Sequence, residues 1–187
     1  MPSLEVSKLC KRYRDFVLGP IDFALEPGMV HGLIGANGAG KSTLFRCLMG
    51  MLRPDQGSIA FNGHAADPDA REWKQAIGYV GDYTPLFENW SGARNLRTLA
   101  RFYEDYDEKQ VLQLAAKFDL NLDQLASSYS TGQRNKLAII HALAHGAHFL
   151  LLDEPTSGLD PLARDTFMEV LCEQMGRQEL TILYATH

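Results

Sequence analysis

The sequence lacks any long hydrophobic run. Although 45% of its 187 residues are hydrophobic, no stretch reaches the ~18 consecutive apolar residues that a membrane-spanning helix needs. Residues 1–5 do not combine a basic region with an apolar signal core. We therefore expect a soluble, cytoplasmic protein that is peripheral to the inner face of the cell membrane and reaches it only through a partner.

Positive charge and cysteine are also scarce. The chain has 18 Lys and Arg against 23 Asp and Glu, a formal net charge of -5, whereas polyanion-binding proteins usually carry a basic excess. We expect no nucleic acid as the main ligand, although a few well-placed cations still suffice for a nucleotide. Cys10, Cys47 and Cys172 do not have the spacing of metal ligands, so reduced and mostly buried thiols are predicted.

What the sequence does contain is an alternation of strand-like and helix-like segments. The nearly continuous apolar run at residues 29–34 indicates a parallel strand that is covered on both faces. Strands alternating with helices predict one α/β domain with a parallel sheet. Strands are expected at residues 4–9, 21–25, 29–34, 58–63, 77–80, 149–152 and 181–185, and helices at 42–49, 134–144 and 161–175.

Residues 88–124 have helical spacing and two apolar stripes. We expect both stripes to be buried. The first contains Leu96, Leu99, Phe102 and Tyr103, and the second contains Val111, Leu112, Leu114, Ala115 and Phe118.

A glycine-rich loop at residues 35–42 matches G-x-x-x-x-G-K-[ST] and lies between an expected strand and an expected helix. Glycines let successive N–H groups turn toward phosphate oxygens, and the helix N-terminus adds positive potential. Lys41 supplies a full charge, and the Ser42 hydroxyl is suited to Mg²⁺. A turn that only joins strand to helix is the alternative, but this setting disfavours it. The predicted nucleotide-binding residues here are Gly35, Ala36, Asn37, Gly38, Ala39, Gly40, Lys41, Ser42 and Thr43.

Two acidic residues, Asp153 and Glu154, follow the buried run at residues 149–152. The carboxyl ends of parallel strands face the ligand crevice in open α/β sheets. Two solvated acids after a strand would be ordinary on their own. Beside a phosphate loop, they predict Asp153 as a partner of Mg²⁺, direct or in its second shell, and Glu154 as the group that orients and polarises water. The residues to this point indicate an ATPase or a GTPase.

Residues 129–134, Tyr-Ser-Thr-Gly-Gln-Arg, decide between these two classes. Upstream of the Leu-Leu-Leu-Asp-Glu-Pro-Thr-Ser-Gly-Leu-Asp run, they resemble the signature of the ATP-binding cassette (ABC) family, usually Leu-Ser-Gly-Gly-Gln, with Tyr129 and Thr131 as departures. Alone, this segment would be a polar turn that caps a helix. The chain thus resembles the ATP-binding subunit of an ABC transporter, and its short helical insertion favours the exporter type.

The resemblance implies a P-loop NTPase (RecA-like) parallel-sheet core, with an antiparallel β subdomain and an inserted helical subdomain. Residues 1–82 and 135–187 would form the core with its β subdomain, and residues 83–134 the helical subdomain with the signature. Relatives continue beyond His187, so we expect a fragment that lacks the C-terminal part of the usual cassette.

The resemblance also implies a site shared between two chains. In the family, two cassettes pack head to tail, and each signature completes the other's ATP site, here through Ser130, Gly132 and Gln133. Residues 155–160 look like the D-loop, which crosses the dimer interface and ends at Asp160. Tyr13 sits where the family places an aromatic residue on the adenine ring, which needs only a flat π face.

Two further positions follow from the resemblance. His187 looks like the switch histidine that contacts the γ-phosphate. Asp82 stands where the family usually has a glutamine that touches Mg²⁺ and relays to the membrane subunit; aspartate is one methylene shorter and charged.

The predicted function is hydrolysis of ATP with Mg²⁺, which powers transport through a transmembrane permease subunit. Lys41, Glu154 and His187 are the predicted catalytic residues, and Ser42, Asp153 and Asp82 the predicted metal partners. The predicted dimer is a homodimer or a pair with a related cassette. A soluble ABC ATPase outside transport is one alternative, and an ATP-binding module with little turnover, because the chain ends at the switch histidine, is the other.

Overall fold

The computed structural model describes residues 3–67, 69–81, 86–177 and 179–186. Asp82 and His187 lie outside the described residues, so their predicted roles stay predictions. No helix in the described ranges is long and apolar enough to cross a membrane.

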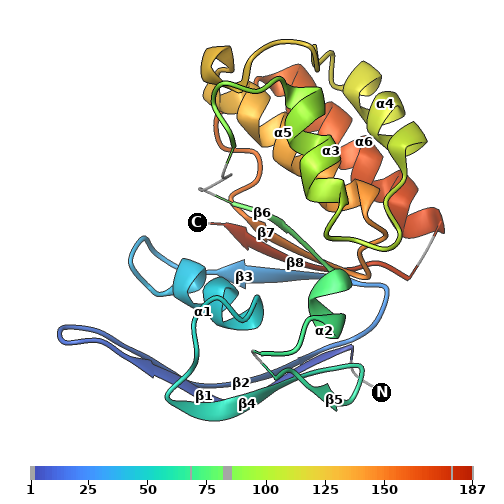
Figure 1. Cartoon of the computed structure of the whole chain (residues 1–187). Helices are drawn as coiled ribbons and strands as arrows, with labels where there is room; N and C mark the ends of the chain where they lie inside the picture. Colours follow the sequence, from blue (N-terminus) through green and yellow to red (C-terminus); the bar gives the residue numbers. More distant parts are fainter. Residues whose placement is uncertain (1–2, 68, 82–85, 178, 187) are drawn as a thin grey trace.

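A parallel sheet lies in the middle of the molecule, with helices α3 to α6 on one side and α1, α2 and an antiparallel sheet on the other (Figure 1). The strand order of the parallel sheet is β3-β8-β7-β6. Its strands are β3 (Val30–Ile34), β6 (Ile77–Val80), β7 (Phe149–Asp153) and β8 (Thr181–Thr186). This arrangement confirms the predicted fold class.

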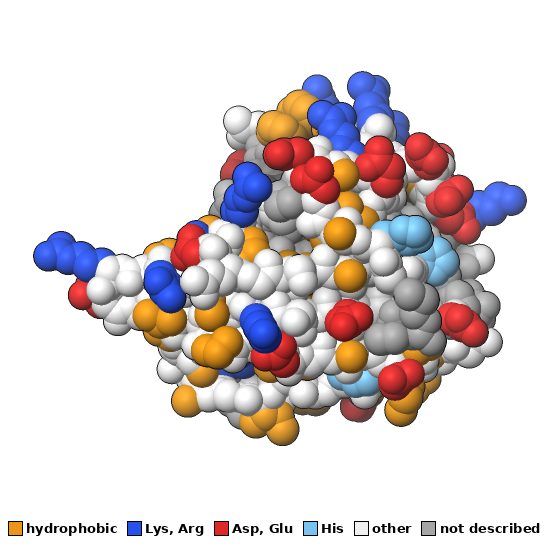
Figure 2. Space-filling model, turned by 90° about the horizontal axis from the view of Figure 1, so that it is seen from below, with side chains coloured by type: hydrophobic (Ala, Val, Ile, Leu, Met, Phe, Trp, Pro, Cys, Tyr) orange, Lys and Arg blue, Asp and Glu red, His pale blue; other side chains and the backbone are white. Residues whose placement is uncertain are grey.

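The antiparallel sheet has the order β2-β1-β4-β5. Its strands are β1 (Leu4–Arg12), β2 (Val17–Leu25), β4 (Gln56–Phe61) and the short β5 (His64–Ala65). Helix α1 (Lys41–Leu48) packs between the two sheets, and α2 (Glu72–Gln75) precedes β6. Acidic and basic side chains are interspersed on the face that Figure 2 shows, as expected from the small net charge.

Strand β7 is buried along its whole length because both of its faces are covered. Phe149 and Leu151 belong to the core beneath the sheet, together with Phe45 of α1. Leu150 and Leu152 point to the opposite face and belong to the core under the helices. The period-2 alternation of a strand thus explains why this run is apolar at every position.

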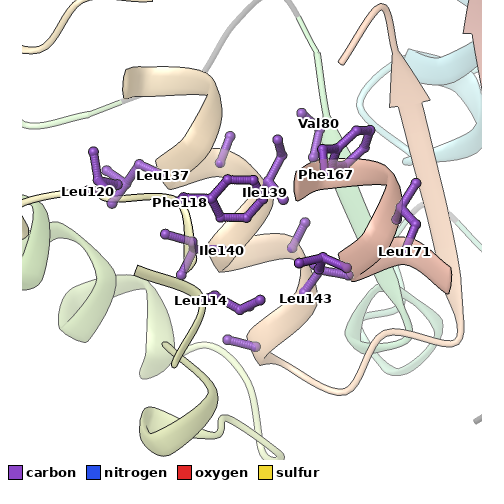
Figure 3. Packing of buried hydrophobic residues seen from close by; sticks show 14 of the residues in the cluster. Val80, Leu114, Phe118, Leu120, Leu137, Ile139, Ile140, Leu143, Phe167 and Leu171 are labelled. Carbon is purple, nitrogen blue, oxygen red and sulfur yellow. The ribbon is translucent and has the colours of Figure 1, made fainter. Parts of the chain in front are cut away.

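The helical layer contains α3 (Gly92–Ala100), α4 (Glu108–Lys117), the 3₁₀ turn η1 (Ala126–Ser128), α5 (Thr131–Ala144) and α6 (Pro161–Arg177). Side chains of α4, α5 and α6 meet in one cluster around Phe118, Ile140 and Phe167 (Figure 3). Burying one such side chain stabilises the folded state by about 1.5–3 kcal/mol. The predicted division at residues 83 and 134 stays a prediction.

Strand β3 corrects one expectation. Val30 and Ile34 are 54% and 78% exposed, so the prediction of a strand covered on both faces is wrong. Val30 pairs with Ile182, which lies in the core under the helices. Val30 therefore points to the side of the sheet where α3 to α6 lie, but β3 is the last strand on its edge, and Val30 and Ile34 stay exposed there. Leu33 points to the other face and packs against the cluster that contains α1.

Two other expectations are corrected at the level of single side chains. Phe102 and Leu112 are 67% and 66% exposed, so each of the two apolar stripes contains one residue that faces solvent. The cysteines are mostly buried, as predicted: Cys10 and Cys47 are buried, and Cys172 is exposed.

Two neighbouring histidines that the sequence did not single out lie at the end of α5: His141 in its last turn, partly buried, and His145 directly after it, buried. The ring of His145 stacks on Tyr103, with ring centroids 4.0 Å apart. His145 Nδ1 lies 2.9 Å from the carbonyl oxygen of His141, and Nε2 lies 3.0 Å from that of Ile77. Nδ1 of His141 finds no hydrogen-bond partner among the described residues. Burial lowers the pKa of both imidazoles, that of His141 to about 4.

This burial predicts that the protein loses stability in mild acid. Between the unfolded pKa of 6.5 and the folded pKa of about 4 for His141, the unfolded state binds the extra proton. The free energy of unfolding therefore falls as the pH falls through this window, by up to about 1.4 kcal/mol per pH unit. Urea denaturation at about pH 7 and about pH 5 measures this slope. His141→Leu should make the slope shallower, and an unchanged slope in that variant would contradict the assignment.

Candidate nucleotide-binding site

A hollow of about 340 Å³ lies at the carboxyl edge of the parallel sheet, where β3 leads into α1 and where β7 ends. It joins segments that are more than a hundred residues apart in the sequence. Its lining residues are Phe16, Ala36, Asn37, Gly38, Gly40, Lys41, Ser42, Thr43 and Glu154. The structure thus brings Glu154 to the predicted phosphate loop, at the edge where open α/β sheets bind ligands.

The backbone of the loop requires glycine. Gly38 and Gly40 have φ angles of 80° and 98°, in the left-handed region. A β-carbon on Gly40 would also lie 2.7 Å from Leu18 Cδ1. Gly40 caps α1 without a side-chain hydrogen bond, so the N-terminus of the helix opens toward the hollow with its positive potential. Such a helix end is suited to binding an anion.

The Lys41 side chain is held in place by backbone carbonyl groups of the phosphate loop. Its Nζ donates hydrogen bonds to the carbonyl oxygens of Gly35 at 2.6 Å and Ala36 at 3.3 Å, and its side chain is 9% exposed. Gly35 and Ala39 do not line the hollow, but the Ala39 N–H closes the loop on the Ala36 carbonyl at 3.1 Å. An ammonium group has three donors, so Lys41 keeps donor capacity for a phosphate oxygen.

Ser42 and Asp153 lie in direct contact. The Ser42 hydroxyl donates to Oδ2 of Asp153 at 2.6 Å, which joins the first turn of α1 to the end of β7. Asp153 is 3% exposed. Mg²⁺ takes oxygen ligands and is usually held by one or two carboxylates together with substrate phosphates. This hydroxyl and carboxylate beside the phosphate loop therefore fit Mg²⁺.

Glu154 has an unusual backbone conformation. Its φ angle is 51°, and the left-handed region costs a non-glycine residue about 1–2 kcal/mol. Its N–H donates to the Ala185 carbonyl of β8 at 3.2 Å, and its carbonyl accepts from the Ser157 N–H at 2.9 Å. These two bonds hold the sharp turn after β7 that places Glu154 at the hollow. Strained backbone of this kind is common at functional sites.

The structure places Tyr13 beside the hollow but not in its lining. Tyr13 is 46% exposed, and its ring centroid lies 6.4 Å from that of Phe16, which does line the hollow. The Tyr13 N–H donates to the Phe16 carbonyl at 2.7 Å, at the turn between β1 and β2. Phe16 is not among the residues predicted from the sequence. The nearby turn, with two aromatic residues three positions apart, was the available signal.

The signature segment, residues 129–134, starts helix α5. The Ser130 hydroxyl accepts from the Gln133 N–H at 3.2 Å, and the Gln133 side chain accepts from the Ser130 N–H at 2.9 Å. This capping box fixes the helix start. Arg134 anchors the segment by a two-pronged contact with Glu88, both bonds at 2.8 Å.

The signature segment packs against the predicted D-loop. A β-carbon on Gly132 would lie 2.6 Å from the Gly158 carbonyl oxygen, so the close approach requires glycine there. Asn135 also donates to the Ser157 carbonyl at 2.5 Å. Asp160 ends the loop and accepts from the Ala163 N–H at 2.9 Å at the start of α6. This hydrogen bond lowers the pKa of Asp160.

Within one chain, the structure does not bring the signature to the phosphate loop. Ser130, Gly132, Gln133 and Asp160 are absent from the lining of the hollow. The start of α5 is exposed at Ser130 and Thr131, and α5 lies on the opposite side of the parallel sheet from α1 (Figure 1). The site residues thus form two groups, one around Lys41 and one around Ser130.

Comparisons of sequence and of fold with known proteins point to one family. Residues 18–157 match the family model described as ABC transporter. The chain is 34% identical to the Nod factor export ATP-binding protein I of Burkholderia pseudomallei over 98% of its length. It is 32% identical to the methionine import ATP-binding protein MetN of Protochlamydia amoebophila, again over 98% of its length. The chain spans 62% and 59% of the lengths of these two relatives.

A solved structure of an ATP-binding subunit of an ABC transporter shares the fold. It superimposes with a TM-score of 0.87 at 29% identity, and the match covers 98% of this chain and 79% of that one. The relatives include one export and one import protein by name, so they do not support the predicted exporter type over an importer. The glycine loop, the acidic pair, the signature segment and these matches together show that the chain belongs to the ABC transporter family.

Proposed function

We propose that this chain binds ATP with Mg²⁺ and hydrolyses it. The observation that carries the proposal is the hydrogen bond between Ser42 and Asp153 in a site where Glu154 and the phosphate loop share one hollow. A base, an oxygen pair for Mg²⁺ and a cationic loop are the groups that phosphoryl transfer to water requires.

In the proposed reaction, Lys41 and the loop N–H groups hold the phosphates, and Ser42 and Asp153 orient the ion. Mg²⁺, when bound, neutralises charge on the phosphate oxygens. Glu154 accepts a hydrogen bond from a water molecule and polarises it for in-line attack on the γ-phosphate. His187 is proposed to steady the γ-phosphate, and Asp82 to contact the ion through water.

We also propose that the complete site forms between two chains. The exposed N-terminus of α5 offers N–H groups and the Ser130 hydroxyl, but it is absent from the hollow of its own chain. A two-fold, head-to-tail pair would place each signature on the partner's phosphate loop, with residues 155–160 at the interface. ATP would then join the two chains, and donors on both sides would stabilise the developing charge.

A mixing experiment tests this shared site. Lys41→Ala removes the phosphate contact, and Ser130→Asp keeps a good helix cap but sets a negative charge against the γ-phosphate. Each variant alone should lack ATPase activity. Equal amounts together should recover about a quarter of wild-type activity, because half of the randomly formed dimers are mixed and each has one complete site.

The matched control for the mixture is a chain that carries both substitutions. Mixed with either single variant, the double variant forms no complete site and should stay inactive. If the two single variants together also stay inactive while wild type turns over ATP, the shared site is wrong. If the Ser130→Asp variant is fully active alone, the signature takes no part in hydrolysis.

We propose finally that ATP turnover powers a transmembrane permease, as the names of the relatives suggest. A second hollow, of about 320 Å³, lies between β6 and the helical layer and is lined largely by apolar side chains, among them Met49, Met51, Leu99 and Tyr103. Gly81, just before the predicted relay position, also lines it. We propose it as the contact with the membrane subunit. Recovery of this chain from membrane extracts with a multi-spanning protein, and its loss on Met51→Asp, tests this role.

A further inference from the structure

Helix α3 and its C-cap residue Arg101 carry an exposed row of arginines. Arg94, Arg97 and Arg101 are all exposed, and spacings of three and four residues place them on one side of the helix. At 1.5 Å per residue, the row is about 10 Å long. No acidic residue occurs between Glu88 and Glu104, so the row is not interrupted by negative charge along the chain.

Aromatic side chains flank this row. The Phe87 ring stacks on Trp90 with centroids 4.2 Å apart, and the Arg94 guanidinium lies 4.1 Å from the centre of the Trp90 ring. Phe87 is 55% exposed, and Phe102, directly after Arg101, is 67% exposed. A shallow hollow of about 520 Å³ lies along the row, lined by Trp90, Ser91, Arg94, Arg97, Thr98 and Arg101. We call these six residues and Phe87 the arginine surface.

The charge of the arginine surface differs from that of the remaining chain. The whole chain has a net charge of -5, so without the three arginines the remainder carries -8. Among the described residues, none of the three arginines takes part in the ion pairs, which involve Lys11, Lys117 and Arg134. A local basic surface on an acidic protein fits an anionic partner at this one place.

We propose that the arginine surface binds the anionic headgroups of a lipid bilayer. Arginines attract phosphate groups, and aromatic side chains such as Phe87 and Trp90 are suited to the boundary between headgroups and acyl chains. A long nucleic acid would extend past this 10 Å row onto the acidic remainder of the chain. A bilayer can contact the arginine surface alone, without reaching the acidic remainder. This contact adds to the expectation that the membrane is reached through a partner, and it does not depend on ATP hydrolysis.

Flotation of the full chain with vesicles tests the proposal. We expect binding to vesicles of phosphatidylcholine mixed with phosphatidylglycerol, and not to phosphatidylcholine alone. The triple variant Arg94→Gln, Arg97→Gln, Arg101→Gln should partition on the order of 100-fold more weakly, and wild-type binding should weaken with salt. A matched control replaces the exposed Arg46, Arg53 and Arg71 by glutamine, which removes the same charge elsewhere and should leave partitioning within about twofold.

Tryptophan fluorescence gives a second readout. The chain has two tryptophans, so Trp73→Phe leaves Trp90 as the reporter, and its emission should shift to shorter wavelength on anionic vesicles. Equal loss of binding in both triple variants would overturn the proposal, as would equal binding to neutral vesicles. Binding of a single-stranded oligonucleotide or of polyglutamate without vesicle binding would overturn it too. None of these outcomes bears on ATPase activity, which is measured separately.

Discussion

Replacing Lys41 by alanine is expected to weaken ATP binding on the order of 100-fold. Hydrogen bonds to charged groups contribute about 1.5–3 kcal/mol each, and about 1.4 kcal/mol corresponds to a tenfold change in affinity. Lys41 is the only cation in the lining of the phosphate hollow, as far as the described residues show. Titration calorimetry with MgATP measures the change.

The control for this variant is Lys109→Ala, which removes an exposed charge on α4 and should leave ATP affinity unchanged. Lys41 also donates to the Gly35 and Ala36 carbonyls, so the alanine variant loses two contacts within the loop as well as the charge. Lys41→Met keeps most of the aliphatic stem and separates the loss of charge from the loss of packing. If Lys41→Met binds ATP as tightly as wild type, the role of Lys41 is contradicted.

Replacing Glu154 by glutamine is expected to lower the rate of hydrolysis by about 10²–10⁴-fold, the usual contribution of a general base. ATP affinity should change by less than about threefold, because glutamine has the same length and removes only the charge near the phosphates. Phosphate release under saturating MgATP measures the rate, and calorimetry with the same variant measures the affinity.

Two controls make the Glu154 result specific. Glu169→Gln removes an exposed acid on α6 and should leave hydrolysis unchanged. Glu154→Gly removes the carboxylate and should therefore be inactive. Because glycine adopts the left-handed backbone at φ 51° without strain, this variant should not lose folding stability. Wild-type turnover by Glu154→Gln would show that another group activates the water.

The phosphate loop and the acidic pair were predictable because their chemistry is local. Gly38, Gly40, Lys41 and Ser42 lie in one short segment, and the spacing of the motif already specifies both its glycine backbone and its polar side chains. Burial of β7 on both faces was predictable for the same reason, since an apolar residue at every position is the pattern of a central parallel strand.

What the sequence did not show depends on long-range packing. Phe16 reaches the hollow only because the β1–β2 hairpin lies against the phosphate loop. The His145 ring meets Tyr103 and the Ile77 carbonyl, which come from separate segments. The exposure of Val30 and Ile34 depends on the position of β3 at the end of the sheet, which a pattern of apolar residues does not encode.

The most direct test of the shared ATP site is the mass of the Glu154→Gln variant with and without MgATP. This variant is expected to bind ATP but not to hydrolyse it. The bound ATP should therefore keep the two chains joined, between the phosphate loop of one and the signature of the other. Light scattering should give about twice the monomer mass of 20.9 kDa with MgATP and the monomer mass without it. A monomer in both conditions, with ATP bound, would contradict the shared site.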